Sequence, residues 1–306
     1  MKYCPECGYE PFYEPAIFCT VCATKLKDKD DVLSKDDTLS AEEFKMAMKP
    51  FEFERLSTGY NLTAIKNKLS TVASVPYGVT SIGNAVFKKC PNLTTVSLPR
   101  SLTAIGDQAF GWCKGKTSYD VYIEDLEFWC AIAFAAGSSN PLAYSKQFIV
   151  GGKATTELDI PDTVDALTDN VFYGFESLTR VKIPSTVRSI GEFAFAYCYG
   201  LTEVTLPESV DTLGVGVFYN CKSLAEVKIN GPVESLEKWV FSTCKSLKRI
   251  YLPASICLIG KEAFKDCTAL TDIYFAGSKK DWKSVQIDKD TNPVLKKAKL
   301  HFDIKF

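Results

Sequence analysis

The chain has 306 residues, of which 46% are hydrophobic and 24% charged, and its formal net charge is −1. This length allows a sizeable core in one large or two smaller domains. A near-neutral charge gives no electrostatic basis for binding nucleic acid or an anionic membrane, and no apolar run is long enough to span a bilayer. The start, MKYCPECGYEPFYEP, lacks the apolar region of a secretory signal, which predicts a cytoplasmic protein with reduced thiols.

Two C-x2-C pairs stand near the N-terminus, Cys4 with Cys7 and Cys19 with Cys22. Four thiolates can close tetrahedrally on Zn²⁺, and four protein ligands leave no open position for catalysis. A segment of about 25 residues is too short for a hydrophobic core, so metal binding would supply most of its folding free energy. We predict a structural zinc ribbon over residues 1–25, similar to the CPxCG…FCxxCG ribbons that precede many bacterial domains. The alternative is four reduced cysteines in a flexible tail.

Residues 26–50 are predicted to form a charged linker and a short helix. The stretch KLKDKDDVLSKDDT is charged and therefore solvated. In SAEEFKMAMKP, Ser40 and Glu43 have the spacing of a capping box, and Pro50 would end the helix.

A 23-residue repeat runs through most of the remaining sequence. Each unit has aliphatic residues three and six positions after its start, phenylalanine eleven positions after it, and a closing run such as LTEVTL. A fixed period of about 20 to 29 residues with leucine and β-branched positions is typical of leucine-rich solenoids, in which strands of successive units stack beside a continuous core. The pattern predicts, over residues 51–306, a leucine-rich-repeat-like solenoid with a stacked parallel sheet and short helical turns. The units start at Pro76, Pro99, Pro161, Pro184, Pro207, Asn230 and Pro253, and only Asn230 breaks the proline rule.

Variant segments are expected within and at both ends of the repeat array. Residues 116–160 interrupt the regular units with Trp129 and Asn140-Pro141, and the C-terminal part carries Trp282 and Asn292-Pro293 at nearly the same spacing. We interpret both as a variant coil with tryptophan as a large core plug. Residues 51–75 are predicted to form short strands that cover the first coil, and KLHFDIKF a strand that covers the last, because an open end would expose core and sheet edge.

Six cysteines share one position of the repeat, fourteen residues after the unit start. Phenylalanine stands there once, which an apolar pocket would accept and a metal or nucleophile position would not. We predict buried free thiols that act as small hydrophobes. Disulfides between neighbouring coils are the rival, disfavoured by the missing export signal. Cys130 and Cys257 fall outside the column and are also expected to fill core space. The column comprises Cys90, Cys113, Cys198, Cys221, Cys244 and Cys267, with Phe175 in the remaining unit.

The unit LP-x-S-V-x-x-I-G-x-x-A-F-x-x-C-x-x-L-x-x-V-x-I resembles the BspA-like leucine-rich repeat of bacterial surface and adhesion proteins. The resemblance covers roughly residues 55–306, variant coils included. Characterised members bind host or matrix proteins, which implies an interaction role for this chain.

Outward-facing strand side chains are the candidate partner-binding residues, because solenoids use such faces for binding. The face mixes charges with two tyrosines, and Tyr and Arg are frequent hot-spot residues. An ordinary solvated face is the alternative. The predicted positions are Thr95, Ser97, Arg180, Lys182, Glu203, Thr205, Glu226, Lys228, Arg249, Tyr251, Asp272 and Tyr274.

The sequence therefore predicts a non-enzymatic scaffold that binds an unidentified protein. One alternative is an adhesin-like binder of host or matrix proteins, exported by a non-classical route to the cell surface. Another is association with nucleic acid through the zinc ribbon, which the balanced charges of that segment disfavour. An enzyme has no support, since His301 is the only histidine and no nucleophile motif, phosphate loop or paired carboxylate stands out.

Overall fold

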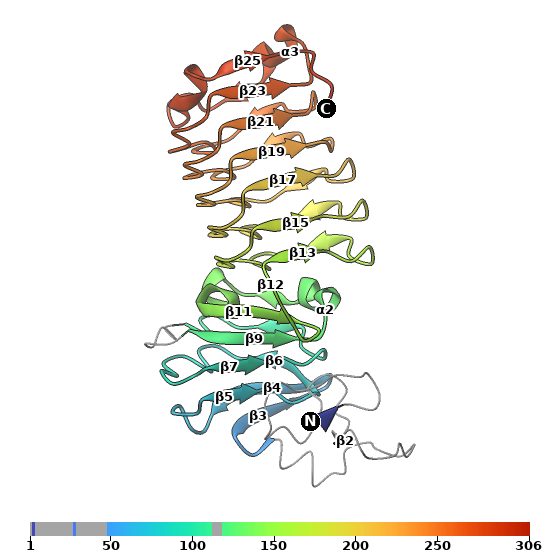
Figure 1. Ribbon diagram of the computed structural model, residues 1–306, viewed down its shortest axis with the longest axis vertical. Helices are drawn as coiled ribbons and strands as arrows, with labels where there is room; N and C mark the ends of the chain where they lie inside the picture. The colour runs from blue at the N-terminus through green and yellow to red at the C-terminus, as the bar shows by residue number, and fades with distance from the viewer. Residues whose placement is uncertain (1, 4–26, 29–47, 112–117) are drawn as a thin grey trace. The chain divides into compact units, whose positions relative to one another are not determined.

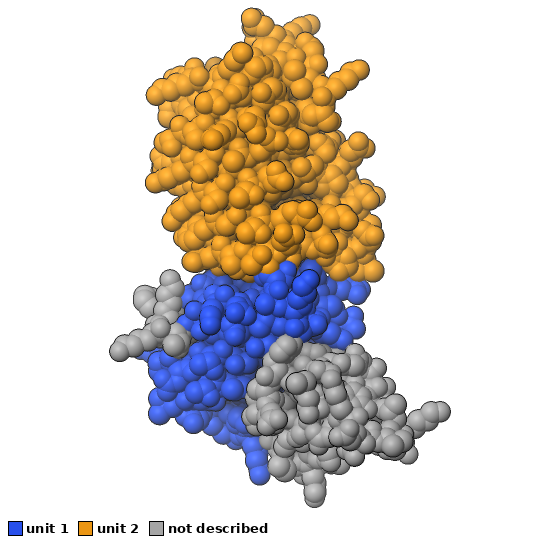
Figure 2. Space-filling model, in the orientation of Figure 1, with its two compact units in different colours: residues 1–155 blue, residues 156–306 orange. Residues whose placement is uncertain are grey.

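The computed structural model describes residues 2–3, 27–28, 48–111 and 118–306 (Figure 1). It divides into two compact units, Met1–Thr155 and Thr156–Phe306 (Figure 2). The four cysteines of the predicted zinc ribbon and Cys113 of the cysteine column lie outside the described residues. Next to them, the two-residue strands β1 (Lys2–Tyr3) and β2 (Lys27–Asp28) pair antiparallel.

The first unit contains two five-stranded sheets. A hairpin of β3 (Phe51–Leu56) and β4 (Gly59–Ile65) begins it, and parallel pairing follows from β4 onward, in agreement with the predicted covering strands. One sheet adds β6 (Val79–Ile82), β8 (Ala104–Ile105) and β10 (Ala133–Phe134) to this hairpin. The other runs through β5 (Val72–Ser74), β7 (Thr95–Ser97), β9 (Tyr119–Ile123), β11 (Ser145–Val150) and β12 (Lys153–Thr155).

The second unit is a β-solenoid of parallel strands stacked coil upon coil (Figure 1). Paired residues of the regular coils are 23 positions apart, as in the register Glu203↔Glu226, so the repeat period is the pairing register there. The longest sheet consists of β17 (Glu203–Leu206), β19 (Glu226–Ile229), β21 (Arg249–Leu252), β23 (Asp272–Phe275) and β25 (Lys299–His301). A two-stranded sheet pairs β13 (Glu157–Asp159) with β15 (Arg180–Lys182). A three-stranded sheet consists of β14 (Ala166–Leu167), β16 (Ser189–Ile190) and β18 (Thr212–Leu213). A second three-stranded sheet consists of β20 (Ser235–Leu236), β22 (Leu258–Ile259) and β24 (Gln286–Ile287).

The repeated phenylalanine forms the centre of the core, as predicted. In the second unit the rings of Phe195 and Phe218 are stacked with centroids 5.6 Å apart, and those of Phe218 and Phe241 repeat the same distance. In the first unit Phe87 and Phe110 stack at 4.9 Å. All these side chains are fully buried, so each coil covers the ring of the coil before it.

The turn that carries the phenylalanine adopts a backbone conformation that the sequence does not predict. The residue nine positions after the unit start has a positive φ in every regular unit, even where it is Phe193 (53°) or Trp239 (65°). This left-handed conformation costs about 1–2 kcal/mol for a residue with a side chain. It is offset because the turn aligns N–H groups toward the next coil, as in the bonds from Phe193 N to Val215 O (2.9 Å) and from Tyr197 N to Tyr219 O (2.8 Å). Among the described residues, the regular coils contain such turns and no helices.

The two variant segments fold alike, as their shared sequence pattern predicts. Each has a short helix, α2 (Leu126–Ala131) or α3 (Lys279–Ser284), followed by a two-residue strand and a 3-10 helix that begins with proline, η2 (Pro141–Tyr144) or η3 (Pro293–Lys296). Trp129 is fully buried, which confirms the predicted plug. Trp282 is only half-buried, with its ring against Phe275 at 5.2 Å.

Asn292 of the second variant coil ends the ladder of turn N–H groups. Its Oδ1 accepts a hydrogen bond from Phe264 N at 2.8 Å, and its Nδ2 donates to Gly260 O and Asp288 O. The neighbouring Thr291 hydroxyl accepts from Glu262 N. These side-chain oxygens replace the carbonyls that a regular coil would supply, and they explain why Asn292 is buried with only 1% of its surface exposed.

The cysteine column is a structural feature with free, buried thiols at each described position. Each thiol from Cys198 onward donates to a phenylalanine carbonyl of the preceding coil, as from Cys198 Sγ to Phe172 O (3.3 Å) and from Cys267 Sγ to Phe241 O (3.0 Å). Burial raises the pKa of the Cys130 thiol to about 12 and also raises the pKa of Cys198. The prediction that Cys257 fills core space is wrong, because its side chain is exposed at a position where other units carry polar residues.

Thiol labelling separates these two environments. We expect iodoacetamide at pH 8 to alkylate Cys257 rapidly in the native protein and to leave Cys130, Cys198 and Cys244 unmodified until urea is added. The thiolate is the reacting form, and burial disfavours it. Tryptic peptide mapping gives the measurement, with Cys257→Ser as the control. Equal native labelling rates at Cys257 and Cys198 would contradict the assignment.

Asn292→Ala should lower the free energy of unfolding by about 2–4 kcal/mol, because it leaves the buried N–H of Phe264 without an acceptor and removes a donor from the part-buried carbonyls of Gly260 and Asp288. Urea denaturation measures the loss, and deuterium exchange should quicken at the amide of Phe264. Lys283→Ala on the exposed surface of α3 is the matched control and should stay within about 0.5 kcal/mol of the wild type. An unchanged stability together with unchanged exchange would remove the proposed role of Asn292.

Candidate protein-binding face

The predicted partner-binding residues of the second unit lie in two columns along the strands. The first position of each strand forms one column and the third position the other, because the parallel pairing places residues 23 apart side by side. Arg180, Lys182, Glu203, Thr205 and Arg249 are exposed. The remaining predicted members, Glu226, Lys228, Tyr251, Asp272 and Tyr274, are half-buried. In the first unit Thr95 is half-buried, and Ser97 is only 4% exposed, so Ser97 offers no surface to a partner.

Ion pairs join charges on neighbouring strands of the first column. Arg249 Nε lies 2.6 Å from the Glu226 carboxylate, which also receives Lys228 Nζ at 3.3 Å. Partial burial opposes ionisation of Glu226, but the hydrogen bonds from Arg249 and Lys228 outweigh it and lower the pKa of this carboxyl. Arg180 makes a similar contact with Glu157 at 3.4 Å between more exposed side chains.

The second column ends in an aromatic ladder of Tyr251, Tyr274 and His301. The Tyr251 and Tyr274 rings are parallel within 9° at 4.5 Å, and the His301 ring stacks on Tyr274 at 4.4 Å. His301 Nε2 is also 2.7 Å from Asp272 Oδ1, and this hydrogen bond lowers the pKa of the Asp272 carboxyl. The sequence analysis placed both tyrosines on this face but did not include His301 among the partner-binding residues.

A second aromatic cluster lies on the turn side of the same unit and was missed by the sequence analysis. The Phe193 ring lies 6.4 Å from the rings of both Tyr219 and Trp239. Gly216 makes room for it, since a Cβ there would clash with the Phe193 ring. Aromatic residues nine, twelve, thirteen and fifteen positions after the unit starts were the signal. The cluster comprises Tyr173, Phe193, Tyr197, Tyr199, Tyr219 and Trp239.

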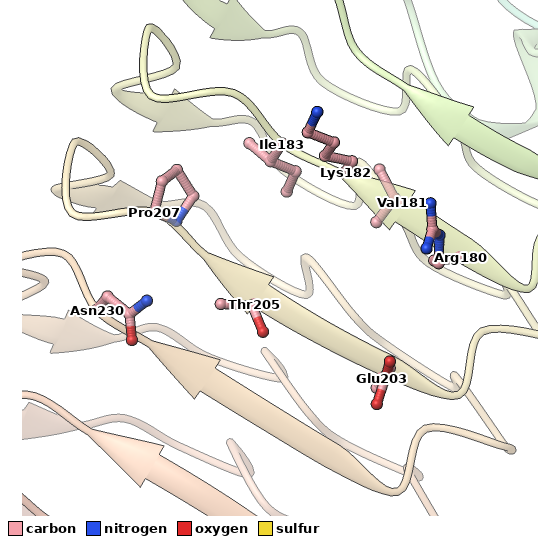
Figure 3. A pocket seen from close by; sticks show the side chains of 8 residues that line it. All are labelled: Arg180, Val181, Lys182, Ile183, Glu203, Thr205, Pro207 and Asn230. Atoms are coloured by element: carbon pink, nitrogen blue, oxygen red, sulfur yellow. The ribbon is translucent and has the colours of Figure 1, made fainter. Parts of the chain in front are cut away.

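The strand face contains a hollow of about 420 Å³ between β15 and β17 (Figure 3). The predicted parallel sheet is interrupted here, because β15 pairs only with β13, and β17 pairs only with β19. The walls include Arg180, Lys182, Glu203 and Thr205, four of the predicted partner-binding residues. Asn230, the residue that breaks the proline rule, lies at one end, as Figure 3 shows.

Residues 48–111 and 118–306, searched together with the two short N-terminal strands, contain no cluster of three or more His, Cys, Asp or Glu side chains that could hold a metal. The zinc ligands Cys4, Cys7, Cys19 and Cys22 are outside that range, so the zinc site stays a prediction. Among the helices that the structure describes, none has the length and apolar character needed to cross a membrane.

The repeat and the stacked parallel strands agree with the comparison to known families. The model of the BspA type leucine rich repeat region matches in six copies over residues 61–135 and 146–282, more than half of the chain. The chain therefore belongs to the BspA type leucine-rich repeat family. No curated protein matches the chain at a significant level.

Several solved structures are similar to the chain in fold. The leucine-rich repeat protein of T. pallidum, TpLRR, is 22% identical over 72% of this chain and 88% of its own, with a TM-score of 0.40. A leucine-rich repeat protein from Eubacterium ventriosum is 21% identical over 72% and 83% of the two chains, with a TM-score of 0.43. The pneumococcal vaccine antigen PcpA is 15% identical over 75% and 72%, with a TM-score of 0.39.

Proposed function

We propose that the chain is a non-enzymatic scaffold that binds a protein partner with the strand face of residues 156–306. The aromatic ladder carries this proposal, because it presents stacked, half-buried rings beside Arg249 and Lys228 on rigid strands. Lys228 Nζ lies 5.3 Å from the centre of the Tyr251 ring. Aromatic side chains lose little conformational entropy on binding, and both tyrosine and arginine are enriched among interface hot spots.

The chemistry of the face favours binding over catalysis. Two of its carboxylates, Glu226 and Asp272, accept hydrogen bonds from Arg249 and His301, which lower their pKa values and make them poor proton acceptors near neutral pH. Membership of a repeat family supports the same reading, since solenoids offer extended surfaces for binding.

A pull-down with the double variant Arg249→Glu/Tyr251→Ala tests the face. We expect the partners captured by the wild-type chain to be lost or at least tenfold depleted, because the variant reverses one charge and removes one ring of the ladder. Lys261→Glu, at an exposed turn position, is the matched charge-reversal control and should retain the partners. An identical partner set in all three samples would overturn the proposal.

We also propose that Cys4, Cys7, Cys19 and Cys22 hold a structural Zn²⁺, on the strength of their paired spacing. Protein purified without chelator should contain about one zinc per chain by elemental analysis, and Cys4→Ser/Cys19→Ser should lose it. Cys257→Ser is the control and should keep full zinc content. Wild-type protein without zinc would refute the proposal.

A further inference from the structure

Charge in the second unit is divided along the stack of coils. Residues 156–215 contain ten Asp and Glu against three Lys and Arg, whereas residues 216–306 contain sixteen Lys and Arg against ten Asp and Glu. Because successive coils stack in chain order, this compact unit has an acidic part and a basic part. The near-neutral charge of the whole chain conceals this division. A surface with opposite charges at separate places is suited to pairing with a second copy of itself.

The division is sharpest in one column of residues on the turn side, eight positions after each unit start. These residues are stacked directly, since each carbonyl from the second member onward accepts a hydrogen bond from the preceding coil, as from Gly216 N to Lys238 O at 2.9 Å. Along the stack the column has two acidic residues, one valine and two lysines, so its charges are opposite on the two sides of the valine. This turn column comprises Asp169, Glu192, Val215, Lys238 and Lys261.

The charges of the turn column are available to a partner. Asp169, Glu192 and Lys261 are exposed and Lys238 is half-buried. None of the four forms an ion pair with another residue that the structure describes, unlike the charges of the strand face. Asp169 Oδ1 accepts a hydrogen bond from Glu192 N at 2.7 Å, which holds the carboxylate on the turn and leaves its negative charge unneutralised.

The turn column lies beside the aromatic cluster of the turn side. Lys238 Nζ is 3.7 Å from the centre of the Trp239 ring, and Phe193 follows Glu192 directly in the chain. The rings of Phe193, Tyr219 and Trp239 are half-buried, so part of their surface is still in contact with water. The turn side therefore combines unpaired charges with apolar rings, as the rim and centre of protein interfaces do.

Two copies of the turn side are complementary in one arrangement. A two-fold axis in the plane of contact, at right angles to the stack of coils, makes the copies antiparallel and places each column opposite itself. With the axis at Val215, Glu192 faces the lysine one coil beyond the axis on the second copy, and Asp169 faces the lysine two coils beyond it. All four charges of each turn column then have a partner of opposite sign. A shift by one coil would leave only half of these pairs, and a parallel arrangement would oppose like charges.

We propose that the turn side of residues 156–306 is the interface of an antiparallel homodimer, held by the turn column and centred on the aromatic cluster. In this dimer Phe193 faces Trp239 of the second copy, and the Tyr219 rings of the two copies face each other near the axis. Association removes the remaining surface of these rings from water. The proposal goes beyond the scaffold function, because the strand face takes no part and stays open to the protein partner.

Sedimentation velocity of the full chain over a hundredfold range of concentration tests the dimer. The wild type should show a monomer–dimer equilibrium whose dissociation constant rises with added NaCl, because salt screens the ion pairs. Lys238→Glu/Lys261→Glu should raise this constant at least tenfold, since two wholly acidic turn columns then face each other. Lys182→Glu/Lys299→Glu, at exposed strand positions, makes the same change in net charge and should alter the constant less than twofold.

A complementary variant tests the register. Asp169→Asn/Glu192→Lys makes the charged part of the turn column wholly basic, and the asparagine keeps an oxygen that can accept the neighbouring backbone N–H. This variant should be monomeric alone, as should Lys238→Glu/Lys261→Glu. A mixture of the two should form a heterodimer, because an acidic column then faces a basic one. Recovery on mixing would also show that neither variant had lost its fold.

Three outcomes would overturn the homodimer. The first is a wild type that stays monomeric at low salt, and the second is a dimer that Lys238→Glu/Lys261→Glu leaves unchanged. The third is a monomer that binds polyglutamate, which would assign the basic coils to a different, acidic partner. The scaffold proposal is tested separately, since Lys238→Glu/Lys261→Glu should still capture the partners that Arg249→Glu/Tyr251→Ala loses.

Discussion

The structure depends on one constraint, which is that alternate backbone N–H groups of a coil's turn find their acceptors in the next coil. Phe193, Phe195 and Tyr197 all donate to carbonyls of the following coil, while the stacked phenylalanine rings fill the space enclosed by the chain. A single coil satisfies neither its polar groups nor its apolar surface, so the fold exists only as an array. Wherever the array changes, another group must supply the missing partner. Asn292 does so with its side-chain amide in the last variant coil.

Much of this architecture is predictable from the sequence, since the repeated phenylalanines and aliphatic residues fix both the period and the core. The left-handed turn residues are not predictable in this way. Phe193 and Trp239 occupy positions that favour glycine, because the ladder they serve outweighs their local preference. The missing pairing between β15 and β17 is also not predictable from the sequence. Residues 180–183 and 203–206 follow the repeat, and only Asn230 departs from it. Cys257 was misassigned because a cysteine at an exposed position looks in sequence like one in the core.

The pairing register also explains how a regular array acquires a distinctive surface. Each outward residue lies directly beside its equivalent in the next coil, so residues 23 apart in sequence act as neighbours. Opposite charges then become ion pairs, as for Glu226 and Arg249, and two successive tyrosines become a stacked ladder. The same pairing neutralises most of the charge on this face. The few charges without ion-pair partners therefore distinguish one part of the face from another.

Lys182 and Glu203 are such charges, and they lie at the place where the strand ladder is open. A break in a sheet normally exposes a strand edge to uncontrolled association. Here the turn and the short strands still hold the two coils together, so the opening stays local. Each of the two edges is also fixed on its far side, β15 by β13 and β17 by β19. The solenoid thus tolerates a local opening of one strand ladder, because the hydrogen bonds of the turn and of the short strands keep the two coils in register.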